Sequence, residues 1–303
     1  NAGGGIANRD HGKIWIQIAP HGDWLPGSSE ISGNDAGGAA AFINDGELRM
    51  VHTLVQWNTS LNGWNAIVNG GFLSVVESRI SGNGTGEGYG GAMLNYGTLE
   101  FVRSLMYGNS AMKGTGGFTN GGRATISNST IAYHNTREDM GAVHNGGVMT
   151  ITNSSIVNSY VQIGTNGTGF AINNLGTLKM ANTIVGNVTE RSEPYSLMTA
   201  PNCAGNIISL GGNISTDNTC AFNAAGDQNN VALKLSELAD NGGPTLTFAP
   251  LPDSPAIDAG DNAQCPATDQ RGEARPQDGN ADGNARCDSG AYEVPLTMIS
   301  PEI

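Results

Sequence analysis

Apolar and polar positions recur along this chain at a near-constant interval. The repeat is anchored on the phrase Asn-x-Gly-x-(apolar), and its six anchors, with spacings of 25, 26, 25, 25 and 29, are Asn44, Asn69, Asn95, Asn120, Asn145 and Asn174. In every repeat, the positions two before, four after, six after and eleven after the anchor are apolar. A near-constant period in this range indicates a repeat architecture.

Within each repeat, the apolar residues follow a period of two, which is typical of β-strands rather than helices. The glycine two residues after each anchor marks a corner that needs positive φ or a close backbone approach. Stacked units would pair each strand with its copy about 4.8 Å away. We therefore predict an all-β, right-handed parallel β-helix of about seven or eight coils over residues 1–200. The frame of leucine-rich repeats, L-x-x-L-x-L, does not occur in the repeats.

Two polar columns run through the predicted stack. The anchor asparagines form the first, and a Ser or Thr nine residues after each anchor forms the second. Side chains that repeat on neighbouring strands contact one another, and each such pair contributes roughly 0.2–1 kcal/mol. We interpret both columns as structural ladders.

Composition predicts the kind of core, and charge restricts the classes of partner that this chain can bind. Glycine supplies 45 of the 303 residues, while 14% are charged and 6% aromatic, so the core is expected to be a narrow column of aliphatic side chains. The net charge of −13 and the pI near 4.6 argue against nucleic acid and anionic membranes as partners. No apolar run is long enough to predict a membrane span. The first residue is not Met, so we expect a processed or trimmed start whose export signal is missing.

The cysteines occur only in the last third, at Cys203, Cys220, Cys265 and Cys287, and no C-x-x-C pair is present. Three connectivities are possible for four cysteines. We predict the sequence-adjacent pairing, Cys203 with Cys220 and Cys265 with Cys287. Disulfides are typical of oxidising compartments, so the expected location is secreted or at the cell surface.

The chain changes character near residue 190, and residues 201–303 are rich in turns. We expect this region to supply the last irregular coils and a segment that caps the exposed end of the stack, because terminal solenoid units must protect an unpaired edge. Three phrases characterise it: Asn241-Gly242-Gly243-Pro244-Thr245, Ser254-Pro255-Ala256-Ile257-Asp258-Ala259-Gly260, and Asp269-Gln270-Arg271-Gly272 followed by Gly290-Ala291-Tyr292-Glu293.

Together with the Asn-x-Gly coils, these phrases resemble the bacterial "choice-of-anchor Q" extracellular β-helix proteins. The match is phrase by phrase over residues 239–303 and generic in the coils. The resemblance implies a right-handed parallel β-helix like that of pectate-lyase-like proteins, on a secreted or surface protein. It implies no defined activity.

One segment has the spacing of a calcium loop. Asp278, Asn280 and Asp282 alternate and are followed by Gly283, while the twelfth position is Ser289 instead of Glu. The predicted ligands of a weak structural calcium ion are Asp278, Asn280, Asp282, Asn284 and Asp288. The alternative interpretation is an acidic turn without metal.

Catalytic candidates are few. The position eight after the anchor reads His52, Glu77 and Arg103 in adjacent coils, which are groups suited to acid–base chemistry on an acidic glycan. The alternative, which we favour, is a ladder of paired charges that continues into Asn128, Asn153 and Asn182. A second group, Arg137-Glu138-Asp139 with His134 and His144, is interpreted as solvated loop charge.

Trp57 and Trp64 flank a loop and would suit sugar stacking if exposed. Two functions stay open. The first, which we favour, is a non-catalytic extracellular structural or adhesive protein that associates with other copies of itself or with cell-surface polysaccharide. The second is a carbohydrate-active β-helix that binds or cleaves a polysaccharide. The Asn-x-Ser/Thr triplets, among them Asn58 and Asn83, are glycan acceptors only in a eukaryotic secretory route.

Overall fold

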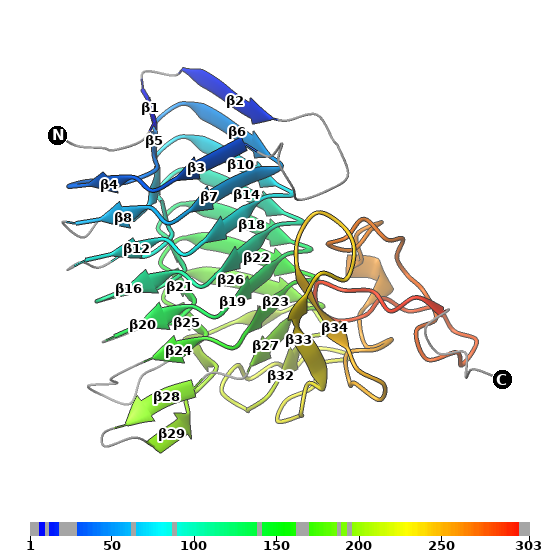
Figure 1. The fold of residues 1–303 in the computed structure, drawn as a ribbon. Helices are drawn as coiled ribbons and strands as arrows, with labels where there is room; N and C mark the ends of the chain where they lie inside the picture. Colours follow the sequence, from blue (N-terminus) through cyan, green and yellow to red (C-terminus); the bar gives the residue numbers. More distant parts are fainter. Residues whose placement is uncertain are drawn as a thin grey trace.

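The chain forms a parallel β-solenoid in a computed structural model that describes residues 6–9, 12–17, 29–61, 65–86, 90–137, 141–161, 170–186, 189–192 and 196–296 (Figure 1). Each turn visits four sheets in order, and six regular turns carry the anchor asparagines. An additional layer at each end brings three of the sheets to eight strands. In the described part of the chain, the helix content is one 3₁₀ turn, η1 (Asn262–Gln264).

The first sheet holds the short strands that end at the anchors: β1 (Ile6–Asn8), β5 (Phe42–Asn44), β9 (Ile67–Asn69), β13 (Met93–Asn95), β17 (Phe118–Asn120), β21 (Val143–Asn145), β25 (Ile172–Asn174) and β30 (Cys203–Ala204). The second sheet holds the longer strands that follow the glycine corner: β2 (Lys13–Gln17), β6 (Glu47–Val51), β10 (Phe72–Val76), β14 (Thr98–Val102), β18 (Arg123–Ser127), β22 (Val148–Thr152), β26 (Thr177–Ala181) and β31 (Ile208–Ser209).

The third sheet is formed by β3 (Ser29–Ser32), β7 (Thr53–Gln56), β11 (Arg79–Ser81), β15 (Leu105–Tyr107), β19 (Thr130–Ala132), β23 (Ser155–Val157), β27 (Ile184–Gly186) and β32 (Ile214–Ser215). The fourth is formed by β4 (Asp35–Ala36), β8 (Thr59–Ser60), β12 (Gly84–Thr85), β16 (Ser110–Ala111), β20 (Asn135–Thr136), β24 (Tyr160–Val161) and β28 (Thr189–Ser192). Pairing between turns is parallel, and β29 (Ser196–Thr199) adds an antiparallel edge to β28.

The register places each apolar column of the sequence in the interior. Leu73 pairs with Leu48 and Leu99 on the neighbouring turns, and the same stacking holds for the other inward positions. These side chains form one continuous core along the solenoid. The glycine after each anchor is required by close approach: a Cβ on Gly71 would lie 2.1 Å from the carbonyl oxygen of Gly46. A side chain at this corner would therefore push successive turns apart.

Both predicted ladders are present. The Nδ2 atom of Asn44 donates to Oδ1 of Asn69 at 2.7 Å, and the series continues at 2.7–2.8 Å from Asn8 to Asn174. In the hydroxyl ladder, the contact is from backbone to side chain: the N–H of Thr53 donates to Oγ of Ser78 at 3.0 Å. Each turn thus satisfies buried polar groups of the next.

A third ladder was not predicted. Asn58, Asn83 and Asn109 are fully buried and joined amide to amide, at 2.9 and 3.0 Å, on the inner side of the corner before the fourth sheet. Asn58 and Asn83 belong to Asn-x-Ser/Thr triplets, but a fully buried amide cannot accept a glycan. These triplets are therefore part of the repeat and not modification sites.

The region after residue 200 has two structural parts. Ala200, Cys203, Cys220 and Phe222 pack on the last turn as part of the main core, and so close its end. Residues 233–296, called the lateral strap below, instead run along the side of the solenoid (Figure 1). The strap contains the hairpin of β33 (Leu235–Ala239) and β34 (Thr247–Pro250).

The strap covers the outer face of the third sheet over its last turns. Its Leu233, Phe248 and Ala256 form a second apolar cluster with outward side chains of the sheet: Ala132, Val157, Ile184 and Ile214. On β19, the hydroxyl of Thr130 donates to Oε1 of Gln270 in the strap at 2.7 Å. Leu105 of β15 shares the outward column of Thr130 and is also fully buried, so the third sheet is covered over β15–β32.

Candidate functional site

The candidate catalytic column lies at a left-handed corner between the second and third sheets. His52, Glu77 and Arg103 have φ values of 49°, 47° and 46°, and the asparagines that continue the column have φ values of 44–48°. Residues other than glycine rarely adopt this conformation, although Asn and His tolerate it better than most. The corner therefore explains why half of the column is asparagine.

The first three residues of this column pair with one another. The Nε2 atom of His52 lies 3.1 Å from Oε2 of Glu77, and the guanidinium of Arg103 pairs with Oε1 of the same carboxylate. Their side chains are 19–31% exposed. Glu77 is thus engaged on both oxygens by its two neighbours, which is the geometry expected of a paired ladder. A general acid or base needs its reacting atom directed at a substrate.

The asparagines of the same column bind the lateral strap. The Nδ2 atom of Asn128 donates to the carbonyl of Thr268 at 2.7 Å, and Asn182 forms two bonds with the backbone of Asp261, at 2.7 and 3.0 Å. With its amide oxygen toward the strap, Asn153 accepts from Nη1 of Arg275 at 2.8 Å. The column therefore has two parts: charged residues pair along the uncovered turns, and asparagines hold the strap along the covered ones.

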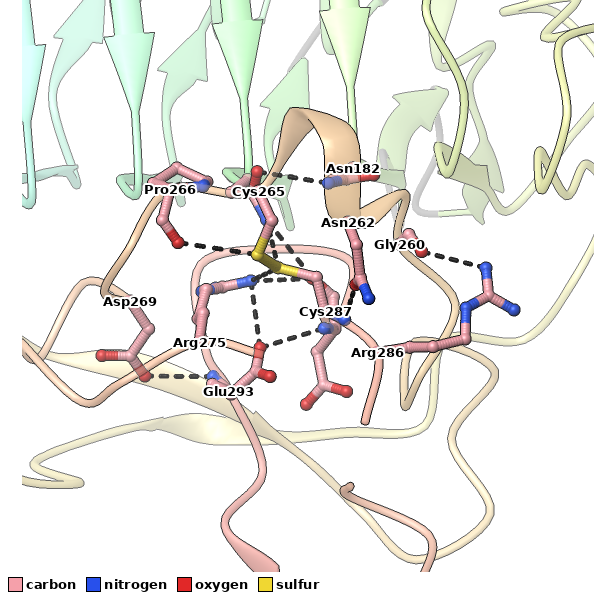
Figure 2. The surroundings of a disulfide bond; sticks show 12 residues. Asn182, Gly260, Asn262, Cys265, Pro266, Asp269, Arg275, Arg286, Cys287 and Glu293 are labelled. Carbon is pink, nitrogen blue, oxygen red and sulfur yellow. Dashed lines mark hydrogen bonds and ion pairs between the residues drawn. A yellow bond between two sulfur atoms is a disulfide. The ribbon is translucent and has the colours of Figure 1, made fainter. Parts of the chain in front are cut away.

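The strap is built on buried charged side chains (Figure 2). The Arg275 and Glu293 side chains have no exposed surface and lie 3.2 Å apart, Nη1 to Oε2. Arg275 also donates to the carbonyl oxygens of Asp288 and Gly290, each at 2.8 Å. Asp269 is equally buried and pairs with Arg271 at 2.7 Å. The Asp-Gln-Arg-Gly and Gly-Ala-Tyr-Glu phrases are thus explained by one interior network.

Asp288 is the unusual carboxylate of this network. Its two oxygens accept the N–H groups of Asp258 and Val294 at 2.7 and 2.6 Å. Burial, followed by the negative charge of Glu293, nevertheless raises the pKa of Asp288 to about 8. Burial also raises the pKa of Glu293, and Arg275 opposes that shift. Because the buried network holds more carboxylates than guanidiniums, retaining a proton lowers its electrostatic cost.

Both predicted disulfides are formed, Cys203–Cys220 and Cys265–Cys287. The first holds the segment that closes the end of the core. The second joins two parts of the strap beside Arg275, whose Nη1 lies 3.3 Å from Sγ of Cys287 (Figure 2). The bridges suggest a protein outside the cytoplasm.

Four of the five predicted calcium ligands share one loop. Asp278, Asn280, Asp282 and Asn284 lie together. The side-chain oxygens of the first three accept backbone N–H groups; Asp278, for example, accepts from Asp282 and Gly283 at 3.1 and 2.8 Å. Asn284 donates to Asp282. Asp288 is buried in the strap network, with both oxygens engaged as described. Among the described residues, no three His, Cys, Asp or Glu side chains gather as metal ligands. Calcium binding by this loop stays a prediction.

The remaining candidates lie apart. Trp57 is 64% exposed, and its ring lies against Gly82 on the next turn. Trp64, Glu138 and Asp139 are outside the described residues. His134 is fully buried in the interior, whereas His144 is half-buried on β21. The structure therefore does not bring these two histidines together.

A shallow cleft of about 80 Å³ lies where the loop between β33 and β34 meets the third sheet. Its walls come from the strap and from one side chain of β11: Arg79, Asp240, Gly243, Pro244, Thr245 and Leu246. The hydroxyl of Thr245 donates to the carbonyl of Arg103 at 3.4 Å, which fixes the loop beside the charged corner. This site was not predicted because its two walls, Arg79 and Asp240, lie far apart in the sequence. The Asn-Gly-Gly-Pro-Thr phrase was its signal.

Within the described residues, no helix is long and apolar enough to span a bilayer. Comparison with protein-family models, curated proteins and solved structures finds no match to this chain. The β-helix expected from the resemblance to choice-of-anchor Q proteins is present, and membership of that family stays a prediction.

Proposed function

We propose that the protein is a non-catalytic structural or adhesive element that works outside the cell. The main support is that its charged side chains are paired with one another or buried. Glu77, the central group of the candidate catalytic column, is paired on both oxygens, and Arg275 and Glu293 are sealed inside the strap. A stack of paired turns, with one disulfide at its end and a second in the strap along its side, is suited to presenting a stiff surface.

The cleft dimensions agree with this proposal. Sites that enclose a small molecule typically have volumes of several hundred Å³, whereas the cleft beside Arg79 measures about 80 Å³. It is too small to surround a sugar ring and hold it against catalytic groups. Adhesion to an extended surface needs no such enclosure.

Two assays test the proposal. In the first, the purified protein is incubated with acidic and neutral polysaccharides, with and without calcium, and unsaturated and reducing ends are followed. We expect no turnover. Turnover that is lost in Glu77→Gln or Arg103→Ala, with the circular dichroism spectrum unchanged, would overturn the proposal and establish a carbohydrate-active enzyme.

The second assay tests the positive claim. The protein is displayed on a bacterial host, and cell–cell aggregation and retention on polysaccharide-coated plates are measured against a host without it. We expect at least one of the two to increase. If neither increases, the adhesive role is wrong, and light scattering over a range of concentrations tests the remaining structural role through self-association.

A further inference from the structure

The lateral strap covers one part of the outer face of the third sheet and leaves the other part open. The strap covers it over β15–β32, where outward side chains such as Leu105 and Ala132 are fully buried, and the strap loop borders Arg79 on β11. On β3 and β7, the outward Glu30 is exposed and the outward Gln56 is partly exposed. The 240–246 loop ends at the boundary and forms the cleft with Arg79. The part of the face that solvent reaches carries a row of polar and aromatic side chains, and the row runs from the cleft along the solenoid axis.

The row is Glu30, Gln56, Arg79 and Tyr107, one residue from each of β3, β7, β11 and β15. Register places them alternately in two outward columns. Each contacts the next: Gln56 Nε2 donates to Glu30 at 2.8 Å, and Arg79 Nη2 donates to Oε1 of Gln56 at 2.9 Å. The Arg79 guanidinium lies 5.6 Å from the centre of the Tyr107 ring. The planar groups are therefore held in place without a ligand.

Hydrogen-bonding capacity remains at the cleft. The Arg79 guanidinium lines the cleft and donates to Gln56 through Nη2, while its enclosed Nε–H has no partner among the described residues, so its terminal Nη groups are the donors directed to a ligand. One oxygen of Asp240 accepts the N–H of Gly242 at 3.0 Å, and its other oxygen has no hydrogen-bond partner in the part of the chain that the structure describes. A guanidinium and a carboxylate on facing walls offer donors and acceptors to adjacent hydroxyl groups of one molecule.

The charge at this place selects the class of ligand. Arg79 lies near the carboxylates of Glu30 and Asp240, and Arg103 pairs with Glu77. The whole chain carries a net charge of −13. Polyanions would be repelled by this field. Hydroxyl-rich neutral molecules need no counter-charge, and the partly exposed ring of Tyr107 and the exposed ring of Trp57 provide flat apolar surfaces for the C–H face of a sugar.

We propose that the cleft and the Glu30–Tyr107 row bind a neutral polysaccharide, with Arg79 and Asp240 holding the hydroxyls of one sugar and Tyr107 stacking on a neighbouring sugar. The small cleft admits the edge of one sugar, and the open row accepts the rest of the chain. The strand spacing, about 4.8 Å, is close to the length of one pyranose along an extended glycan. This inference rests on the proposed adhesive function and names its ligand class and site.

The test is affinity electrophoresis in native gels that contain hydroxyethylcellulose, galactomannan or xyloglucan, with alginate and polygalacturonate as acidic comparisons. We expect at least one neutral polymer to retard the protein. In Arg79→Ala, Tyr107→Ala and Asp240→Ala the apparent Kd is expected to rise at least tenfold. Asp240 lies in the strap loop, away from the strand ladders, so its variant remains informative if Arg79→Ala does not fold.

The matched controls are Arg123→Ala and Tyr96→Ala, which remove exposed residues of the same types on other faces. They are expected to bind like the parent protein. Retardation by the acidic polymers alone, equal retardation of parent and cleft variants, or no retardation by any neutral polymer would each overturn the inference. If adhesion is retained in the display assay, the proposed function still holds without this site. Glycan turnover would instead overturn the proposed non-catalytic function without arguing against the binding site.

Discussion

Asn109 and His134 occupy the same interior position on successive turns, and the third amide ladder stops between them. Asn109 is bonded to Asn83 at 3.0 Å, but both ring nitrogens of His134 are buried without a well-aligned hydrogen bond. Burial lowers the pKa of His134 to about 4, with the backbone of Asn109 and Met106 opposing the shift. A column of amides is thus interrupted by a group that resists protonation.

His134→Asn is expected to extend the ladder and to reduce acid sensitivity. The folded pKa of His134 lies below its unfolded value of 6.5, so its contribution to stability is present above pH 6.5 and is lost as the pH falls toward 4. The unfolding free energy that the His134 shift contributes, and that is lost over this pH range, amounts to about 3 kcal/mol. Urea unfolding at pH 7 and pH 4.5 should show a smaller loss for the variant than for the parent protein.

The matched control is His144→Asn, because His144 is half-buried on the outside of β21 and outside the ladder. It should alter the pH dependence less than His134→Asn does. Equal pH dependence of the parent protein and His134→Asn would show that the buried imidazole does not set the acid response.

The left-handed corner gives a prediction about strain. Replacing His52, Glu77 and Arg103 together by Asn removes the Glu77–Arg103 ion pair and the His52–Glu77 contact, which at partly exposed positions contribute roughly 0–1 kcal/mol each. It also places a residue that tolerates positive φ at each position. We expect the unfolding free energy to change by less than about 1 kcal/mol. Glu77→Val should instead destabilise by about 1–3 kcal/mol, because a β-branched residue is strained there. Thermal unfolding followed by circular dichroism measures the stability of the triple Asn variant and of Glu77→Val. An equal loss of unfolding free energy in the two variants would disprove the role of backbone conformation at this corner.

The solenoid could be predicted from the sequence because each structural demand repeats. The same contact is made by Gly46, Gly71 and Gly97, and the anchor asparagines contact copies of themselves, so periodicity alone identifies them. The left-handed corner was missed because His52, Glu77 and Arg103 carry no signal of positive φ. The strap was expected at the end because one sequence does not show which face remains apolar. The outward Ala132, Val157 and Ile184 required it at the side.

The Cys265–Cys287 bridge is expected to hold the strap and not the solenoid. Its cysteines have a sequence separation of 22, and a loop of that size corresponds to about 3 kcal/mol on the chain-entropy model. In Cys265→Ser/Cys287→Ser, hydrogen exchange should accelerate over residues 255–294 and stay unchanged in β6–β22. The Cys203→Ser/Cys220→Ser variant is the comparison, because that bridge closes the core end. Equal acceleration along all turns in the first variant would contradict a separable strap.

Asp288 gives the opposite pH dependence to His134. Its folded pKa, about 8, lies above the unfolded value of 3.8, so its protonated form is favoured by folding. The resulting stability is fully present below about pH 4 and declines as the pH rises to about 8. Asp288→Asn cannot ionise, and its stability should fall less than that of the parent protein between pH 5 and pH 8. We expect the two slopes to differ by at least about 2 kcal/mol over this range.

The absolute stability of Asp288→Asn should nevertheless be lower, because an amide offers one oxygen where the N–H groups of Asp258 and Val294 now have two. Stability and pH slope therefore change in separate ways, and denaturant unfolding at pH 5 and pH 8 measures both. Asp253→Asn, at an exposed strap position, should leave the slope unchanged. If Asp288→Asn and the parent protein lose the same free energy between these pH values, Asp288 is ionised throughout, and the two N–H bonds outweigh burial and the charge of Glu293.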